Sequence, residues 1–155
     1  MKFKAGLVLA LMLIVTVANA FAAGQKKEPK LEGAYKYVST TFPGGKQTEA
    51  DAKGMIVVHG KYMAFVRAGV NRQTWSQTDP QDERTKRIVA AYQGLAAAAG
   101  MFEISGTTIT LMQHAQASPA TMGKEAKWEY KLEGNTLKLK PAGNLDVEFT
   151  FEKMP

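Results

Sequence analysis

The chain has 155 residues, 45% of them hydrophobic, with a formal net charge of +6 and no cysteine. This length suits one domain with a single core. The lack of cysteine excludes disulfides and thiolate metal sites, and two histidines are too few for an all-histidine catalytic zinc site. Lysines alternate with glutamates instead of clustering, so the charge does not indicate nucleic-acid binding.

Residues 1–22 have the layout of a secretory signal peptide. Two lysines precede an apolar run over residues 5–18, and two small-x-small cleavage sites follow. An uncleaved membrane anchor is the alternative, because the run is nearly long enough to span a bilayer, but the small residues at its end favour cleavage. We expect a periplasmic or secreted protein that begins at Phe21 or Ala23 and has no stable membrane insertion.

Residues 23–30 are charged and are predicted to be a mobile linker, and residues 31–155 are predicted to form a β-barrel domain. The first strand is expected over residues 33–42, which are rich in β-branched and aromatic side chains. The polar residues that follow, up to Lys53, are expected to be a loop. The second and third strands are predicted over residues 55–58 and 61–67.

One segment is predicted to be helical, and it follows the third strand. Asp79 and Pro80 give an N-cap and a first-turn proline, and Gly100 is a natural stop. Apolar side chains repeat at helical spacing between these signals: Ile88, Ala91, Tyr92, Leu95 and Ala99. This stripe predicts that the helix lies across an apolar surface.

Period-two alternation resumes after the helix, over residues 101–115. A turn at Ser105-Gly106 is predicted to pair Phe102 with Ile109. Opposed residues share a side of the sheet, so one apolar face is expected to contain Phe102, Ile104, Ile109 and Leu111.

A second hairpin is predicted around Gly134-Asn135, a two-residue loop with glycine first, which is typical of a type II′ turn. This loop pairs Leu132 with Leu137 and Tyr130 with Leu139. The inward face of the hairpin is therefore Trp128, Tyr130, Leu132, Leu137 and Leu139. The last strand is predicted over residues 145–152.

Eight short antiparallel strands form either a sandwich or an up-and-down barrel. Sequential hairpins favour the barrel, because each neighbour in sequence is then a neighbour in space and no edge is left unpaired. The predicted fold class is all-β: an eight-stranded antiparallel up-and-down barrel with one helix between the third and fourth strands.

Four segments carry a family resemblance: LEGAYKYVST, KGMIVVHGKYMAF, GMFEISGTTIT and WEYKLEGNTLKLKP. Their order, with the helix after the third strand, resembles the bacterial lipocalin-like domain family, a group of small calycin-type β-barrels, from about Leu31 to the end of the chain. The resemblance implies a lipocalin-like barrel whose interior receives a small apolar molecule. It implies no particular activity.

The candidate ligand-binding residues are those expected to face the barrel interior or its mouth: Phe65, Arg67, Tyr92, Phe102, Leu111, Trp128, Tyr130 and Leu139. Core filling is the alternative for Trp128 and Tyr130. The helix stripe is mostly alanine and too thin to fill a barrel mouth, so we expect a partly open cavity. Trp75, in the loop before the helix, either covers the mouth or packs on the helix.

The orientation of Arg67 depends on the loop at His59-Gly60, because a one-residue change there moves the side chain to the other face of the strand. An inward Arg67 at the strand end suits a bidentate contact with a carboxylate head group. A rim arginine in water is the alternative.

The remaining titratable residues do not predict a site. His114 is expected to be outward and solvated, and His59 is expected to be a turn residue. Asp79, Asp82 and Glu83 are explained as helix-start chemistry, so no metal site and no cofactor are predicted.

The sequence therefore predicts an exported barrel that binds a small hydrophobic or amphipathic molecule in its interior. The alternative is a solid-cored structural or protein-interaction module of the cell envelope with no ligand. An eight-stranded barrel is just wide enough for either, so the volume of its interior decides between them. An enzyme is not expected, because the sequence has no cysteine, no Ser/His/Asp order and no glycine-rich phosphate loop.

Overall fold

A computed structural model describes residues 31–144 and 146–155 of the chain. The predicted signal peptide and linker lie outside the described residues, as does Leu145 of the predicted last strand. From Leu31 onward the chain forms one compact unit. No helix in this described part combines the length and the apolar character needed to cross a membrane.

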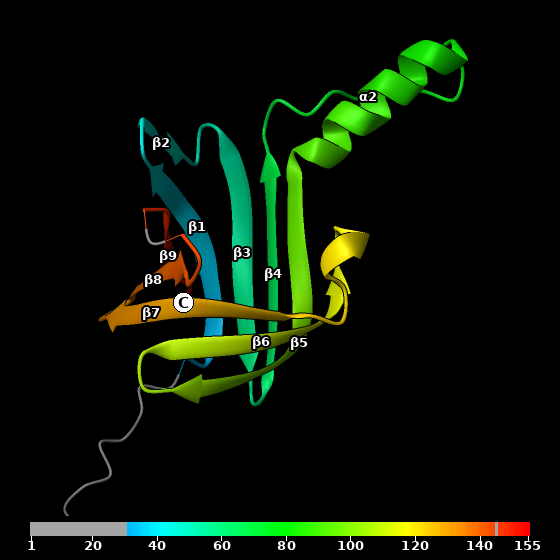
Figure 1. Ribbon diagram of the computed structural model, residues 1–155. Coiled ribbons are helices and arrows are strands. Elements are labelled where there is room, and N and C mark those ends of the chain that lie inside the picture. The colour runs from blue at the N-terminus through cyan, green and yellow to red at the C-terminus, as the bar shows by residue number, and fades with distance from the viewer. Residues whose placement is uncertain (1–30, 145) are drawn as a thin grey trace, which may run out of the picture. The chain divides into compact units, whose positions relative to one another are not determined.

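The described residues form nine strands and two helical segments (Figure 1). The strands are β1 (Gly33–Phe42), β2 (Gly45–Thr48), β3 (Ala52–His59), β4 (Tyr62–Gly69), β5 (Leu95–Ser105), β6 (Thr108–Gln116), β7 (Glu125–Glu133), β8 (Thr136–Pro141) and β9 (Glu148–Lys153). The helical segments are α2 (Gln81–Gln93) and a 3-10 turn, η1 (Pro119–Thr121).

Eight of these strands close into an antiparallel barrel. Each strand from β3 to β9 pairs with the next, and β1 pairs with β3 on one edge and with β9 on the other. The predicted all-β, eight-stranded up-and-down barrel is confirmed, and with it the architecture that the lipocalin-like resemblance implies. The ninth strand, β2, lies in the segment predicted to be a loop; the turn at Pro43-Gly44 folds it back onto the second half of β1.

The helix differs from its prediction in position and length. With β2 counted, α2 lies between the fourth and fifth strands, not between the third and fourth. It ends at Gln93 with Gly94 as its C-cap, so Leu95–Ala99 of the predicted helix belong to β5. Alanine favours helices, but here hydrogen bonding to both β4 and β6 overrides that preference.

The prediction that the helix stripe lies across an apolar surface is wrong. Figure 1 shows α2 extending away from the barrel, and Ile88, Val89 and Tyr92 are 41%, 49% and 48% exposed. Ala91 is the buried residue of α2, and the loop before the helix runs back along it, with Arg72 Nε donating to the Ala91 carbonyl at 2.9 Å. The exposed Trp75 of this loop borders a surface hollow together with Ala91 of the helix, and it is not among the residues that line the cavity inside the barrel.

The core is built from inward side chains of β1, β3, β4, β6, β7, β8 and β9. Its largest fully buried members are Tyr35, Tyr37, Ile56, Ile109, Leu137 and Phe151. Phe151 makes edge-to-face contacts with Tyr37 and Phe65, at ring-centroid distances of 5.9 and 6.2 Å. Such contacts add to the stabilisation from burial.

The β7–β8 hairpin is confirmed residue by residue. Leu132 lies opposite Leu137 and Tyr130 opposite Leu139, and Gly134 has φ +59°, as the first position of a type II′ turn requires.

The β5–β6 register is shifted by two residues from its prediction. The turn residues are Gly106 and Thr107, so Phe102 pairs with Leu111 and not with Ile109. A shift of two leaves each side chain on its predicted face, because side chains alternate with a period of two.

Candidate ligand-binding cavity

A cavity of about 270 Å³ lies inside the barrel, beside the packed core. The barrel is therefore not solid throughout. This volume is slightly below the range for pockets that hold drug-sized ligands, roughly 300 to 1,000 Å³. Its lining consists of Ile56, Met63, Phe65, Arg67, Ala96, Ala97, Ala98, Ile109, Leu111, Gln113, Gln116, Ala126, Trp128, Leu139, Phe149 and Phe151.

The hollow exists because β5 carries methyl groups where its neighbours carry large side chains. In the β4–β5 ladder Arg67 lies opposite Ala96, and Phe65 lies opposite Ala98. Opposed residues share a face, so these two alanines point inward. In the β6–β7 ladder Leu111 likewise lies opposite Ala126. Small side chains at these positions leave space that a regular alternation of large residues would fill.

Arg67 points into the barrel. The β3–β4 turn is Gly60-Lys61, so Ile56 pairs with Phe65 and Gly54 with Arg67. Ile56 is 1% exposed and lines the cavity, which fixes this side of the hairpin as the inner one. The sequence left the orientation of the Arg67 side chain open, and the structure shows that it points inward.

The guanidinium of Arg67 is held by two neighbours. Its Cζ lies 5.2 Å from the centre of the Tyr37 ring, a cation–π contact, and Nη2 donates to the side-chain oxygen of Gln47 on β2. Tyr37 is fixed in turn, since its hydroxyl and that of Thr40 are 2.9 Å apart. The Nε atom of Arg67 is buried and has no hydrogen-bond partner in the part of the chain that the structure describes.

Two glutamines supply the other polar groups of the lining. Gln113 is buried, and its amide donates to the Lys124 carbonyl at 3.3 Å and accepts from Gln116. The β5–β6 ladder is irregular between Ala99 and Gly100, where β6 holds one extra residue, His114. This bulge moves Gln116 to the inner face, where simple alternation from Gln113 would have placed Ala115.

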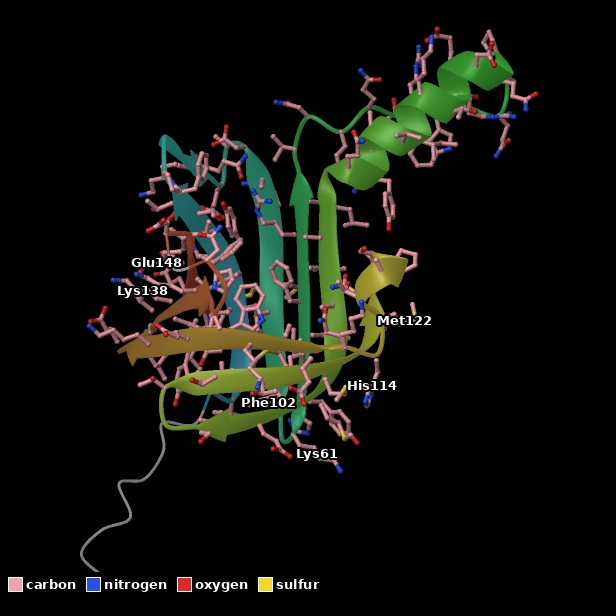
Figure 2. The ribbon with its side chains drawn as sticks, viewed as in Figure 1. Lys61, Phe102, His114, Met122, Lys138 and Glu148 are labelled. Atoms are coloured by element: carbon pink, nitrogen blue, oxygen red, sulfur yellow. The ribbon has the colours of Figure 1, made fainter. Side chains whose placement is uncertain are left out.

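Five of the eight candidate residues line the cavity: Phe65, Arg67, Leu111, Trp128 and Leu139. Tyr130 is 8% exposed and belongs to the packed core, and the half-buried Phe102 packs against that core from the β5–β6 hairpin (Figure 2). Tyr92 lies on the projecting α2, with its hydroxyl donating to the Ala117 carbonyl. The structure does not bring these three side chains to the cavity.

Sequence reasoning missed the two glutamines and the inward alanines as lining residues. Continuing the alternation of Ile109 and Leu111 by one step would have placed Gln113 inward. No such signal exists for Gln116, because it faces inward only through the bulge at His114. The alanines were expected on a helix.

The other titratable groups of the described residues do not gather into a second site. His114 is exposed on the outer surface of β6 (Figure 2), and the exposed His59 lies 2.7 Å from Glu32 through Nδ1. Burial, and then the charge of Glu32, raises the pKa of Tyr35 above its usual value. Among residues 31–144 and 146–155, no three His, Asp or Glu side chains gather as a metal site would require.

The sequence predicted that Asp79 caps the N-terminus of α2, but the structure shows no side-chain capping hydrogen bond there. The N-cap position belongs to Pro80, and the Asp79 carboxylate accepts the backbone N–H of Ser76 at 2.8 Å and lies 3.4 Å from Arg87. Its role is to close the loop that precedes the helix.

Comparison with protein-family models finds no match, and comparison with curated proteins finds none. Among solved structures, the chain is similar to a lipocalin-like protein from Bacteroides uniformis, with 11% identity, a TM-score of 0.49 and coverage of 81% of this chain and 100% of that one. An uncharacterized protein from Bacteroides eggerthii gives 9% identity, a TM-score of 0.45 and coverage of 79% and 98%. Human cRBP IV gives 12% identity, a TM-score of 0.37 and coverage of 81% and 99%.

Proposed function

We propose that this protein binds a small hydrophobic or amphipathic molecule inside its barrel and catalyses no reaction. The observation that carries the proposal is the cavity itself, whose walls are aliphatic and aromatic apart from three polar side chains. Ligand sites are typically concave and mostly apolar, with a few placed polar groups that fix orientation. The cavity has this composition.

The proposal is tested without guessing a ligand. Native mass spectrometry of protein purified from its own host, followed by organic extraction, is expected to reveal a bound small molecule. A direct binding assay uses Trp128, which lines the cavity and is one of two tryptophans in the chain. In the Trp75→Phe variant Trp128 is the sole tryptophan, and bound apolar probes are expected to change its emission. Absence of both signals would overturn the proposal.

Export is a second part of the proposal. The lysines and apolar run of residues 1–22 support cleavage of a signal peptide, which releases a periplasmic or secreted protein. Intact mass of the exported product is expected to correspond to a chain that begins at Phe21 or Ala23. A product that keeps residues 1–20 and fractionates with membranes would contradict it.

A protein-interaction module remains the second candidate, and one observation favours it. The outer face of β3 to β6 carries a shallow trough whose side chains are mostly alanine and valine, and Val57 and Val66 are 41% and 40% exposed. Exposed apolar patches often mark contact surfaces. If no probe or host molecule enters the barrel, this outer face becomes the leading functional surface.

A further inference from the structure

We infer that the ligand is an amphipathic acid, whose anionic head group, a carboxylate, binds the Nε edge of Arg67 while its apolar body lies deeper in the barrel. This inference rests on the proposed binding function and specifies the chemistry of the same cavity. It follows from an uncompensated cation in an apolar cavity and from the direction in which the lining changes from polar to apolar.

Among the described residues that line the cavity, Arg67 is the one that carries a charge. None of the ion pairs among the described residues includes it. Its hydrogen bond to Gln47 is to a neutral amide, and its Nε–H is buried without an acceptor. Arg67 is half-buried as a residue, but its Nε is buried, and a buried polar or charged group is costly unless an opposite charge or hydrogen bonds compensate it. The cavity therefore favours an anionic guest over a neutral or cationic one.

The donor is held in place before a ligand arrives. The Tyr37 ring supports one face of the guanidinium, and Gln47 anchors Nη2. Across the β3–β4 ladder, Gly54 has no side chain to crowd the arginine. A planar guanidinium fixed in this way suits the planar fork of a carboxylate, and little conformational freedom is lost on binding.

The amides of the cavity do not compete for this role. The Gln113 amide already donates to the Lys124 carbonyl and accepts from Gln116, and the Gln116 carbonyl accepts the backbone N–H of Ser118 at 3.3 Å. With these groups engaged, the Nε–H of Arg67 is the buried side-chain donor that the described residues of the lining leave unpartnered.

The pairing of β4 and β6 with β5 determines which way an amphipathic ligand would lie in the cavity. β4 and β6 are both antiparallel to β5, so their C-terminal ends lie at the same end of the barrel. Arg67 and Gln116 lie near those ends, whereas Phe65 and Leu111 lie further back along the same strands. A head group at Arg67 therefore places an apolar body among the aromatic and aliphatic side chains.

The test compares head groups at constant chain length. Hexyl, octyl and decyl carboxylates, alcohols and amines are titrated into the Trp75→Phe protein, with Trp128 emission as the readout. We expect each carboxylate to bind roughly 10- to 100-fold more tightly than its alcohol, as is typical of a hydrogen bond to a charged group, and each amine to bind more weakly than its alcohol. This comparison tests the head-group preference in a protein whose Arg67 is not substituted.

The Arg67→Met variant is expected to lose the preference for the carboxylate, so that a carboxylate and its matched alcohol bind with similar affinity. Arg72→Met is the matched control, because Arg72 lies on the loop beside α2, outside the cavity lining. If the unmodified protein binds alcohols as tightly as carboxylates, the head-group inference is wrong and the proposed binding function stands. If no probe binds and no host molecule co-purifies, the binding function itself fails.

Discussion

Gly54 lies directly opposite Arg67 in the β3–β4 ladder, and a Cβ atom added to Gly54 would lie 3.1 Å from the Cβ of Arg67 and 2.6 Å from the carbonyl oxygen of Val66. The second distance is too short for the backbone to tolerate without moving. Gly54→Ala is therefore expected to lower the free energy of unfolding by about 1 to 3 kcal/mol and to weaken carboxylate binding by displacing Arg67.

Urea unfolding and the Trp128 titration measure these two effects. Gly143→Ala is the matched control, since nothing lies within 4 Å of a Cβ built there and its φ is not in the left-handed region. Equal stability of the two variants would show that the β3–β4 ladder has room for a side chain at Gly54.

The projecting helix predicts a contrast between two isoleucines. Ile88 on α2 is 41% exposed, whereas Ile109 on β6 is 0% exposed. Ile109→Ala is expected to lower the free energy of unfolding by about 2 to 5 kcal/mol, and Ile88→Ala to change it by less than about 0.5 kcal/mol. Urea denaturation measures both. A comparable loss in Ile88→Ala would mean that α2 packs against the barrel in solution.

Two lysines share one carboxylate on the β7–β8 hairpin. Lys131 and Lys138 face each other, and their Nζ atoms lie 2.7 and 3.3 Å from Glu133 oxygens. The hydrogen bonds and charges of these lysines, with Lys131 first, hold the pKa of Glu133 below its usual value. A lowered folded-state pKa stabilises the fold above the unfolded-state pKa, and this contribution is lost as pH falls through the folded-state pKa.

NMR titration of the Glu133 carboxyl checks this arrangement. Lys131→Gln is expected to raise the pKa of Glu133 toward its usual value, and Lys138→Gln to raise it less. Lys140→Gln is the control, because Lys140 pairs with Glu148 at 3.6 Å. An unchanged pKa in Lys131→Gln would mean that the exposed pair does not persist in solution.

The sequence predicted the hairpins best where turn chemistry and alternation agree. In the β7–β8 hairpin, Gly134 fixes the turn and large apolar residues alternate with charged ones, so both face and register were predictable. In β3, apolar residues occupy both faces: Ile56 and Val58 point inward, while Met55 and Val57 line the outer trough. Such a strand does not reveal its inner side, which is why the orientation of Arg67 needed the structure.

The cavity was less predictable because it depends on residues whose placement is decided by their neighbours. Ala96 and Ala98 carry helix-favouring side chains in a strand. Gly100 allows the bulge opposite His114, since a Cβ there would lie 1.7 Å from the Met112 carbonyl oxygen. One glycine thus changes which side chains of β6 face inward, and alternation within β6 alone does not contain that information.

Filling the hollow tests whether binding takes place inside the barrel. Ala98 points inward opposite Phe65 and lines the cavity, whereas its neighbour Ala99 lies opposite Ala64 and lines the outer trough only. Ala98→Leu is expected to weaken binding of octanoate and octanol alike, by about tenfold or more, because the added carbons occupy the space of the ligand's apolar body. Ala99→Leu is expected to leave both affinities unchanged.

Stability separates cavity filling from damage to the fold. A side chain that fits an existing cavity gains contacts without displacing neighbours, so Ala98→Leu is expected to unfold at the same urea concentration as the parent protein or a higher one. Loss of binding in Ala98→Leu with intact stability, and with binding retained in Ala99→Leu, would locate the ligand in the barrel, because Ala98 also borders the trough whereas Ala99 borders the trough alone. Loss of binding in Ala99→Leu but not in Ala98→Leu would instead locate the ligand in the trough on the outer face of β3 to β6.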